Sequence, residues 1–183
     1  MEVEWRAFEL HPEVPAEGMD PPWDPELRRQ SREHFERLAR EAGLPLGSRT
    51  RLANSRLALE AAEWAKALGP AAHDGLHRAI FQAYFVDGRN IGDVEVLVEA
   101  ATSCGLDPAD LRLALAEGRY REAVQKQGEE ARELGVTAVP TFLAGGYVVV
   151  GAQPSEALRR LMRAVGAQPR GAGGPMVALD DQP

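Results

Sequence analysis

One run of residues near the C-terminus, 134–150, constrains the fold more than any other part of the sequence. It reads Leu-Gly-Val-Thr-Ala-Val-Pro-Thr-Phe-Leu-Ala-Gly-Gly-Tyr-Val-Val-Val. Gly135 can take the left-handed conformation that ends a helix. Residues 139–143 form a short apolar run, the glycine pair at 145–146 turns the chain, and residues 147–150 return it. The sequence therefore predicts a helix followed directly by a β-hairpin.

A proline at the entrance of the first predicted strand needs a physical reason, because Pro140 has no backbone N–H to donate to a ladder. A cis Val139–Pro140 bond is one reason, since it would turn the strand entrance and leave neighbouring backbone groups free. The alternative is an ordinary hairpin with a trans proline on an edge strand. The sequence favours the cis arrangement.

The run Gly-Val-Thr-Ala-Val-Pro-Thr-Phe, the Gly-Gly-Tyr turn and Gly151-Ala152-Gln153-Pro154 together resemble the DsbA family. The nearest branch is the FrnE-type dithiol–disulfide oxidoreductases, whose relatives include 2-hydroxychromene-2-carboxylate isomerases and kappa-class glutathione transferases. The string Val-Glu-Trp-Arg-Ala-Phe-Glu-Leu-His-Pro at 3–12 is similar to the segment that forms the second strand of the thioredoxin motif in these proteins. The resemblance implies an α/β, thioredoxin-like fold with an all-helical insertion domain.

The order of the predicted elements agrees with that fold. Residues 1–10 alternate polar and apolar side chains and predict a strand, most clearly over 3–8. Capping residues and apolar stripes then predict helices that begin near Asp24, Asn54, Pro70, Asp93, Asp107, Arg119 and Pro154. We expect residues 1–20 and 119–166 to form an incomplete thioredoxin-like part, residues 21–118 the helical insertion, and residues 167–183 a disordered tail.

Composition narrows the partners and the compartment. A formal charge of −7 over 183 residues argues against nucleic acid as a partner. No apolar run approaches the roughly 20 residues of a membrane helix, and the N-terminus does not read as a secretory signal, so we expect a cytoplasmic protein that does not bind membranes. The single cysteine, Cys104, lies on an apolar helical stripe and is expected to be a buried, inert core residue.

The resemblance also implies a segment that has no counterpart in these residues. Family members carry a first strand and then a Cys-x-x-Cys, or a serine, at the N-terminus of a long helix, where the helix dipole lowers the pKa of a thiol. We expect the natural protein to begin upstream of Met1, and the chain as given to be catalytically incomplete. Without that central strand the inner strand edges are unpaired, and two further outcomes stay open: residues 3–8 could pair directly with the hairpin, or another chain could fill the gap. These residues alone are therefore expected to associate or to be unstable, with a homo-oligomer through the strand edges as one outcome.

Candidate site residues follow from the resemblance and from position. Pro140 would form the cis-proline loop, Val139 would pair its backbone with an extended substrate, and Thr141 and Phe8 would flank that groove. Asn54 begins an insertion helix that faces the active-site cleft in this family; helix capping is the competing interpretation. His73 and His77 are spaced i, i+4, but solvent-facing histidines are the expectation there, and no metal site is predicted.

Three functions remain open at this stage. The first is thiol–disulfide exchange or isomerisation on a protein substrate, with no cofactor. The second is a glutathione-dependent isomerase-like or kappa-class transferase-like activity on a glutathione-like substrate. The third is a non-catalytic remnant of the fold that keeps a peptide groove, so whether the chain is itself an enzyme stays open.

Overall fold

The structure, a computed structural model, describes residues 3–48 and 51–167. The chain divides into two compact units, which we call the helical unit (Trp5–Gly135) and the hairpin unit (Met1–Glu4 with Val136–Pro183). The tail expected over 167–183 lies outside the described residues except for Ala167. The boundaries expected at residues 20 and 119 rest on the family resemblance and stay a prediction.

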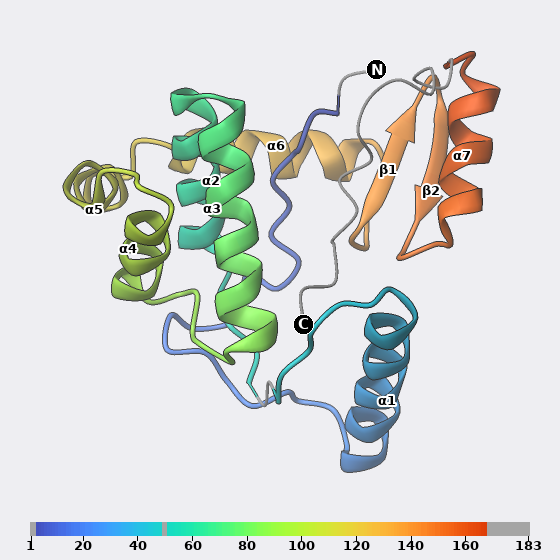
Figure 1. Ribbon diagram of the computed structural model, residues 1–183, viewed down its shortest axis with the longest axis horizontal. Coiled ribbons are helices and arrows are strands. Elements are labelled where there is room, and N and C mark those ends of the chain that lie inside the picture. Colours follow the sequence, from blue (N-terminus) through green and yellow to red (C-terminus); the bar gives the residue numbers. More distant parts are fainter. Residues whose placement is uncertain (1–2, 49–50, 168–183) are drawn as a thin grey trace, which may run out of the picture. The chain divides into compact units, whose positions relative to one another are not determined.

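Helices dominate the described chain (Figure 1). Within its described residues the hairpin unit holds two strands and one helix: β1 (Thr141–Ala144), β2 (Tyr147–Val150) and α7 (Ser155–Ala164). The helical unit holds α1 (Pro25–Glu41), α2 (Arg56–Leu68), α3 (Pro70–Phe81), a π-helical turn (Gln82–Val86), α4 (Val94–Ser103), α5 (Pro108–Glu117) and α6 (Arg121–Glu133).

Side-chain caps fix where several of these helices begin. The carboxylates of Asp24, Asp93 and Asp107 each accept a hydrogen bond from a backbone N–H in the first turn of α1, α4 and α5. Such bonds satisfy donors that have no partner inside the helix. The predicted starts of these three helices are therefore confirmed.

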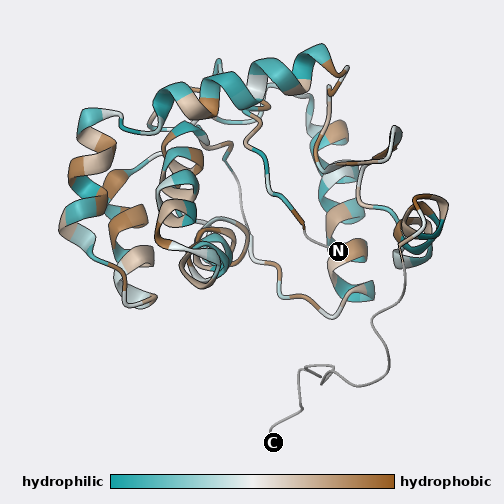
Figure 2. Cartoon of the chain, turned by 90° about the horizontal axis from the view of Figure 1, so that it is seen from above, coloured by the Kyte–Doolittle hydropathy of each residue, from teal (hydrophilic) through white to brown (hydrophobic). Residues whose placement is uncertain are grey.

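The core of the helical unit lies where α2, α3, α4 and α5 meet. Trp64, Leu76, Leu97 and Leu111 are fully buried there. In Figure 2 brown apolar and teal polar residues alternate along the helices, as expected for helices that bury one stripe. The indole N–H of Trp64 donates to Asp110 at 2.7 Å, which satisfies the polar atom of the largest core side chain.

Helix α1 differs from the other helices of this unit, because none of its residues is buried. Its surface carries i, i+3 and i, i+4 ion pairs from Arg29 to Glu26 and Glu33. Leu27 and Phe35 are 47% and 46% exposed. Although α1 has 17 residues, neither it nor any other helix in the described ranges combines the length and hydropathy needed to span a bilayer.

The hairpin unit is built on one tight turn. β1 and β2 pair antiparallel, with Leu143 opposite Val148 and Ala144 opposite Tyr147. Gly145 and Gly146 have φ of +54° and +82°, a conformation that suits glycine and matches the twist of a two-residue hairpin. A side chain at Gly145 would also come within 2.7 Å of Val165 Cγ1. The predicted hairpin is confirmed.

The two faces of this hairpin have different surroundings. Phe142 and Val149 face the same side and are half-buried, and α7 packs against β2. On the opposite face Leu143, Val148 and Val150 are 48%, 55% and 50% exposed. We call this second side the bare face of the hairpin.

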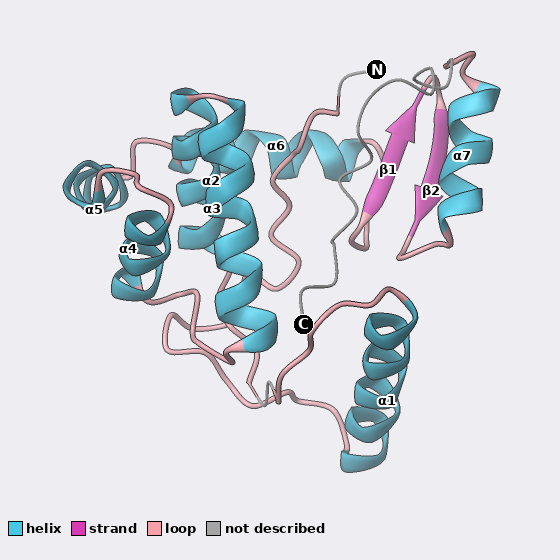
Figure 3. Cartoon of the chain, in the orientation of Figure 1, coloured by secondary structure: helices cyan, strands magenta, loops and turns pink. Residues whose placement is uncertain are grey.

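The prediction of a strand over residues 3–8 is wrong. Residues 3–9 run as irregular chain, drawn as a loop in Figure 3, and no described strand pairs with them. The side chains of Arg6 and Glu130 form an ion pair, and Ala7 N–H donates to Gln127 Oε1 at 2.6 Å. Alternating hydropathy permits a strand, but a ladder also needs a neighbouring strand. Here residues 5–9 are held by side chains of α2, α3 and α6.

Removal of the cap on α5 gives a direct test of this local reading. Asp107→Ala should lower the free energy of unfolding by about 1 kcal/mol, because two first-turn N–H groups lose their acceptor. Chemical denaturation followed by circular dichroism measures the change. Asp107→Asn keeps an acceptor oxygen and should be close to wild type; equal loss in both variants would contradict the cap.

Candidate functional site

The loop that enters β1 brings together three of the predicted site residues. The peptide bond between Val139 and Pro140 is cis. The carbonyl of Pro140 accepts a hydrogen bond from Gly151 N–H at 2.7 Å, and the Thr141 hydroxyl donates to the carbonyl of Ala138 at 2.7 Å. The loop is therefore tied to β2 on one side and to its own backbone on the other.

Val139 differs from its neighbours in having free backbone groups. Neither its N–H nor its C=O bonds to any residue in the described part of the chain, and the residue is 47% exposed. An exposed donor and acceptor at the end of a strand can pair with an extended peptide as an added strand. Val139 therefore has the chemistry that its predicted binding role requires.

Phe8, the predicted flank of the groove, lies in the helical unit. The guanidinium carbon of Arg132 on α6 is 5.4 Å from the centre of its ring, within the range of a cation–π contact. The hydrogen bond from Ala7 to Gln127 holds the preceding residue on the same helix. Phe8 is thus fixed by α6, and its predicted role toward a substrate stays a prediction.

The side-chain amide of Asn54 makes two hydrogen bonds within the protein, one through its nitrogen and one through its oxygen. Its Nδ2 donates to the carbonyl of Val14 at 2.5 Å, and its Oδ1 accepts from Arg56 N–H at 2.9 Å. The second bond covers a donor at the start of α2, the geometry of a capping interaction. The geometry supports capping, and the substrate-binding role of Asn54 stays a prediction.

A buried charged network, which the sequence reasoning missed, lies beside this region of the helical unit. Glu60 on α2 is 1% exposed and its carboxylate oxygens make no hydrogen bond to described residues. Arg121 Nε is 3.6 Å from Glu60 Oε1, and Arg56 Nε is 3.3 Å from Glu9 Oε1. Burial raises the pKa of Glu60, and Arg121 opposes that rise. The signal was present in the sequence, because Glu60 falls inside the apolar stripe of α2.

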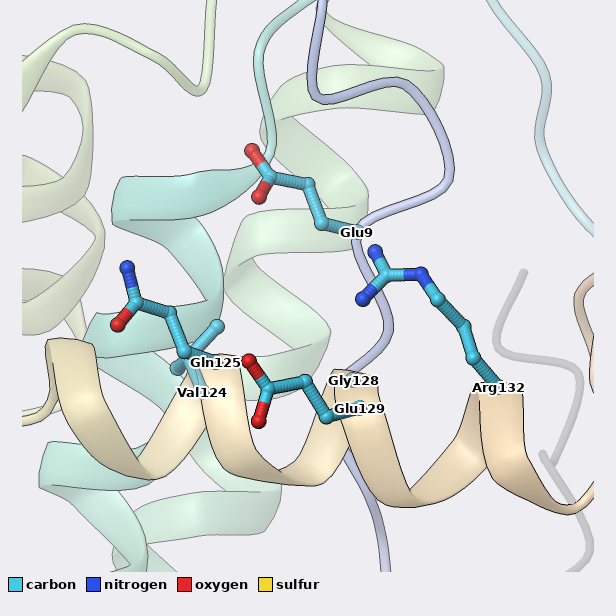
Figure 4. A pocket seen from close by; sticks show the side chains of 6 residues that line it. All are labelled: Glu9, Val124, Gln125, Gly128, Glu129 and Arg132. Carbon is cyan, nitrogen blue, oxygen red and sulfur yellow. The ribbon is translucent and has the colours of Figure 1, made fainter.

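A polar hollow of about 240 Å³ lies between Glu9 and α6. Figure 4 shows its six lining residues, five of which come from successive turns of α6. Arg132 supplies a guanidinium and Glu9 and Glu129 supply carboxylates, so the lining carries charge of both signs. The hollow is lined by Glu9, Val124, Gln125, Gly128, Glu129 and Arg132.

The two histidines of α3 were expected to face solvent, and neither of them is exposed. His73 is buried, and the ring of His77 lies 4.6 Å from that of Trp5 and 4.7 Å from that of Phe81. Burial lowers the pKa of His77, and the neighbouring His73 lowers it further. Within the described residues there is no group of three or more His, Cys, Asp or Glu arranged to hold a metal.

Cys104 belongs to the helical unit, whereas the loop at Val139 and Pro140 belongs to the hairpin unit. The expectation that Cys104 is a buried core residue is wrong, because it is only half-buried. It caps the C-terminus of α4, one residue beyond the end of the helix whose apolar stripe it was expected to join. The 183 residues contain no other cysteine. A Cys-x-x-Cys pair is therefore not among them.

Comparison with known proteins identifies the class to which this chain belongs. The family model of the DSBA-like thioredoxin domain matches residues 1–163, so the chain is a member of that family. Its fold is α/β and thioredoxin-like with a helical insertion.

Individual relatives agree with this assignment. The chain is 32% identical over 155 residues to the uncharacterized protein YwbO of Bacillus subtilis (strain 168), covering 83% of this chain and 76% of that protein. It is similar to a probable DsbA oxidoreductase, SCO1869 of Streptomyces coelicolor, at 30% identity and a TM-score of 0.78, covering 90% and 76% of the two chains. A 2-hydroxychromene-2-carboxylate isomerase shares the fold at 21% identity and a TM-score of 0.70, covering 90% and 79%.

The buried carboxyl of Glu60 predicts an unusual dependence of stability on pH. A carboxyl whose pKa is raised by folding stabilises the fold below its unfolded value of about 4.5, and this contribution is lost as the pH rises through the folded value. Glu60→Met removes the charge at similar volume, so we expect it to gain about 1 kcal/mol at pH 7. It should also flatten the decline of stability above pH 4.5.

Urea unfolding between pH 4 and pH 8 measures both effects. Glu122→Met on the exposed surface of α6 is the matched control and should leave the pH dependence unchanged. A Glu60→Met variant that is less stable than wild type at pH 7 would show that the pair with Arg121 outweighs the cost of burial.

Proposed function

We propose that this chain is the substrate-binding part of a FrnE-type dithiol–disulfide oxidoreductase or isomerase acting on protein thiols and disulfides. The observation that carries the proposal is the exposed Val139 backbone at the entrance of β1, in a chain of the DSBA-like family. An extended polypeptide that pairs with Val139 would be held in one orientation beside the loop. Pro140 and Thr141 shape that loop, and Phe8 is proposed as a flank of the groove.

The chemistry of such a site is thiol–disulfide exchange. A thiolate attacks one sulfur of a disulfide, a mixed disulfide forms and a thiolate leaves; the second thiol of the pair then attacks the mixed disulfide and releases the reduced product. Two electrons pass from the dithiol to the substrate disulfide. Because these residues contain one cysteine, the attacking pair would come from outside this sequence, and this chain contributes positioning.

The compartment belongs to the same proposal. A chain of this length with one unpaired cysteine has no structural disulfide of its own, as is usual where thiols are kept reduced. We therefore propose a cytoplasmic location.

A glutathione-dependent function is the second candidate. The similarity to a 2-hydroxychromene-2-carboxylate isomerase, at 21% identity, supports the shared fold. Glutathione is itself a short extended peptide and could pair with Val139 in the same manner. Titration calorimetry with reduced glutathione and with a peptide of ten or more residues separates the two candidates, because glutathione binding without peptide binding would favour the second.

Backbone pairing at Val139 can be tested with a proline substitution. Val139→Pro removes the free N–H, so we expect the affinity for carboxymethylated insulin B chain to fall about fivefold, the equivalent of ~1 kcal/mol. Val148→Pro removes an N–H from the far strand of the hairpin and is the matched control. Equal weakening in both variants would contradict pairing at Val139.

Catalysis by these residues alone is tested by insulin reduction. With dithiothreitol as reductant, the chain should not accelerate insulin precipitation above the background rate, because it supplies no dithiol. Turbidity at 650 nm, recorded beside a thioredoxin control, gives the measurement. Acceleration that survives Cys104→Ser would overturn the view that the reactive pair lies outside this sequence.

A further inference from the structure

The polar hollow beside α6 is not used by the proposed function. It lies wholly within the helical unit, between Glu9 and the stretch of α6 from Val124 to Arg132, and none of its lining residues belongs to the hairpin. Its volume is about 240 Å³, below the roughly 300–1,000 Å³ of pockets that hold drug-sized ligands. An occupant would therefore be about the size of one amino acid.

Gly128 lines the hollow from the middle of α6, where a glycine needs an explanation. Glycine weakens a helix relative to alanine, because it loses more backbone entropy on folding. The φ of Gly128 is not positive, so the backbone does not require glycine. The three nearest atoms that a Cβ would meet all belong to the Arg132 guanidinium, the closest at 3.4 Å, so packing against another segment does not require glycine either. What the glycine provides is open space beside that guanidinium.

Arg132 presents a guanidinium that has no carboxylate partner among the described residues. Its Cζ lies 5.4 Å from the centre of the Phe8 ring, and Figure 4 shows the side chain reaching back over α6 toward Glu9. Glu129 stands three residues before Arg132, a spacing at which helical ion pairs form, but no such pair joins them. A guanidinium binds a carboxylate through two parallel hydrogen bonds. The hollow thus holds a preformed place for one carboxylate.

The remaining charges of the hollow define the rest of the ligand. The Glu9 carboxylate lies 3.3 Å from Arg56 Nε, so its charge is already balanced. Glu129 makes no ion pair within the described part of the chain, and Gln125 supplies a neutral amide. One positive and one negative charge are therefore left for a ligand. The complementary molecule carries one carboxylate and one ammonium on neighbouring atoms, whereas each end of a polypeptide carries only one of these groups.

We propose that this hollow binds a free α-amino acid. The ligand carboxylate would accept two hydrogen bonds from the guanidinium of Arg132, and the ligand ammonium would donate to the carboxylate of Glu129. The side-chain amide of Gln125 offers a further donor and acceptor, and the space left by Gly128 admits the ligand beside the guanidinium.

The site is separate from the proposed function, which rests on the backbone of Val139 in the hairpin unit. A free amino acid has no extended backbone that could pair with Val139, and the hollow contains no residue of that unit. Binding at the hollow is measured without peptide, so its failure and the failure of the proposed function are distinct results.

NMR titration of the full chain tests the ligand class. L-alanine, L-leucine and L-glutamine are the probes, because they share the zwitterionic head and differ in the side chain. We expect at least one of them to bind with a Kd of about 1 mM or lower and to shift the Gly128 amide signal. The amide and the N-acetyl derivative of that amino acid each lack one charge and should bind about tenfold more weakly. Absence of binding by all three probes, or equal binding of the derivatives, would overturn the proposal.

Substitutions that remove one charge test the assigned residues. Arg132→Gln and Glu129→Gln should each weaken binding about tenfold. Arg160→Gln on α7 and Glu122→Gln on α6 change exposed residues outside the hollow and are the matched controls, expected to bind as the wild type does. Circular dichroism confirms that all four variants keep their helices. Wild-type affinity in Arg132→Gln or in Glu129→Gln would contradict the proposed contacts.

Gly128→Ala separates a binding role from a structural one. The added methyl occupies space beside the guanidinium, so we expect the affinity for the amino acid to fall about fivefold. The same change improves helix propensity, so the Tm should rise by about 3 °C. A lower Tm would show that the glycine serves packing, and unchanged affinity would show that the space beside Arg132 is not the site; either result would overturn the proposal.

Discussion

A two-stranded antiparallel hairpin has two faces and two edges, and α7 covers one face. Most of what the hairpin unit can do follows from this constraint. The Gly145–Gly146 turn fixes the register, and the register decides that the backbone groups of residues 142 and 144 point inward and those of residues 141 and 143 point outward. The same alternation places Leu143, Val148 and Val150 on the bare face. The proposed peptide binding at Val139 would use these unpaired groups.

In the helical unit, neighbouring helices bury the apolar side chains, and side-chain caps satisfy backbone groups at the helix starts. The side chains of several helices pack around Trp64 and Leu97 to form its core. At the starts of α4 and α5, aspartate side chains accept hydrogen bonds from backbone N–H groups that have no partner inside the helix. Residues 5–9 lack a strand partner and are held by side-chain contacts with α2, α3 and α6 instead. One consequence is the burial of Glu60 beside the charged pair of Arg56 and Glu9. A buried carboxyl lowers the free energy of unfolding at neutral pH. The pH dependence of stability therefore depends on how residues 5–9 pack beside Glu60.

Membership of the DSBA-like family and the geometry of the β1 entrance support the same proposal, in which these residues position a substrate and a dithiol outside them reacts with it. Under the proposed function the exposed backbone of Val139 would hold an extended substrate, and the one cysteine of the sequence lies in the helical unit, at the end of α4. Thiol exchange needs a nucleophile, a leaving thiolate and a substrate held in line between them. Under the proposed function, these residues would meet the third requirement.

Local patterns in the sequence predicted most of the elements, because caps, glycines and apolar periodicity act over a few residues. The hairpin over 139–150, its following helix and the starts of α1, α4 and α5 needed no tertiary information. The family resemblance and the position of Val139 at the strand entrance also came from the residues alone. The sequence pattern did not predict the π-helical turn at Gln82–Val86, because apolar periodicity over so few residues does not separate it from an α-helix.

What the tertiary structure decided were the features that depend on partners distant in sequence. The alternation over 3–8 predicted a strand, but a strand exists only beside another strand, and the neighbours of this segment are helices. The sequence pattern predicted that His73 faces solvent and did not identify Glu60 as a buried residue. Both side chains are buried, because other parts of the chain pack over them. A sequence specifies which side chains share a face of an element; which faces become covered depends on what packs against them, and that is settled only when the whole chain folds.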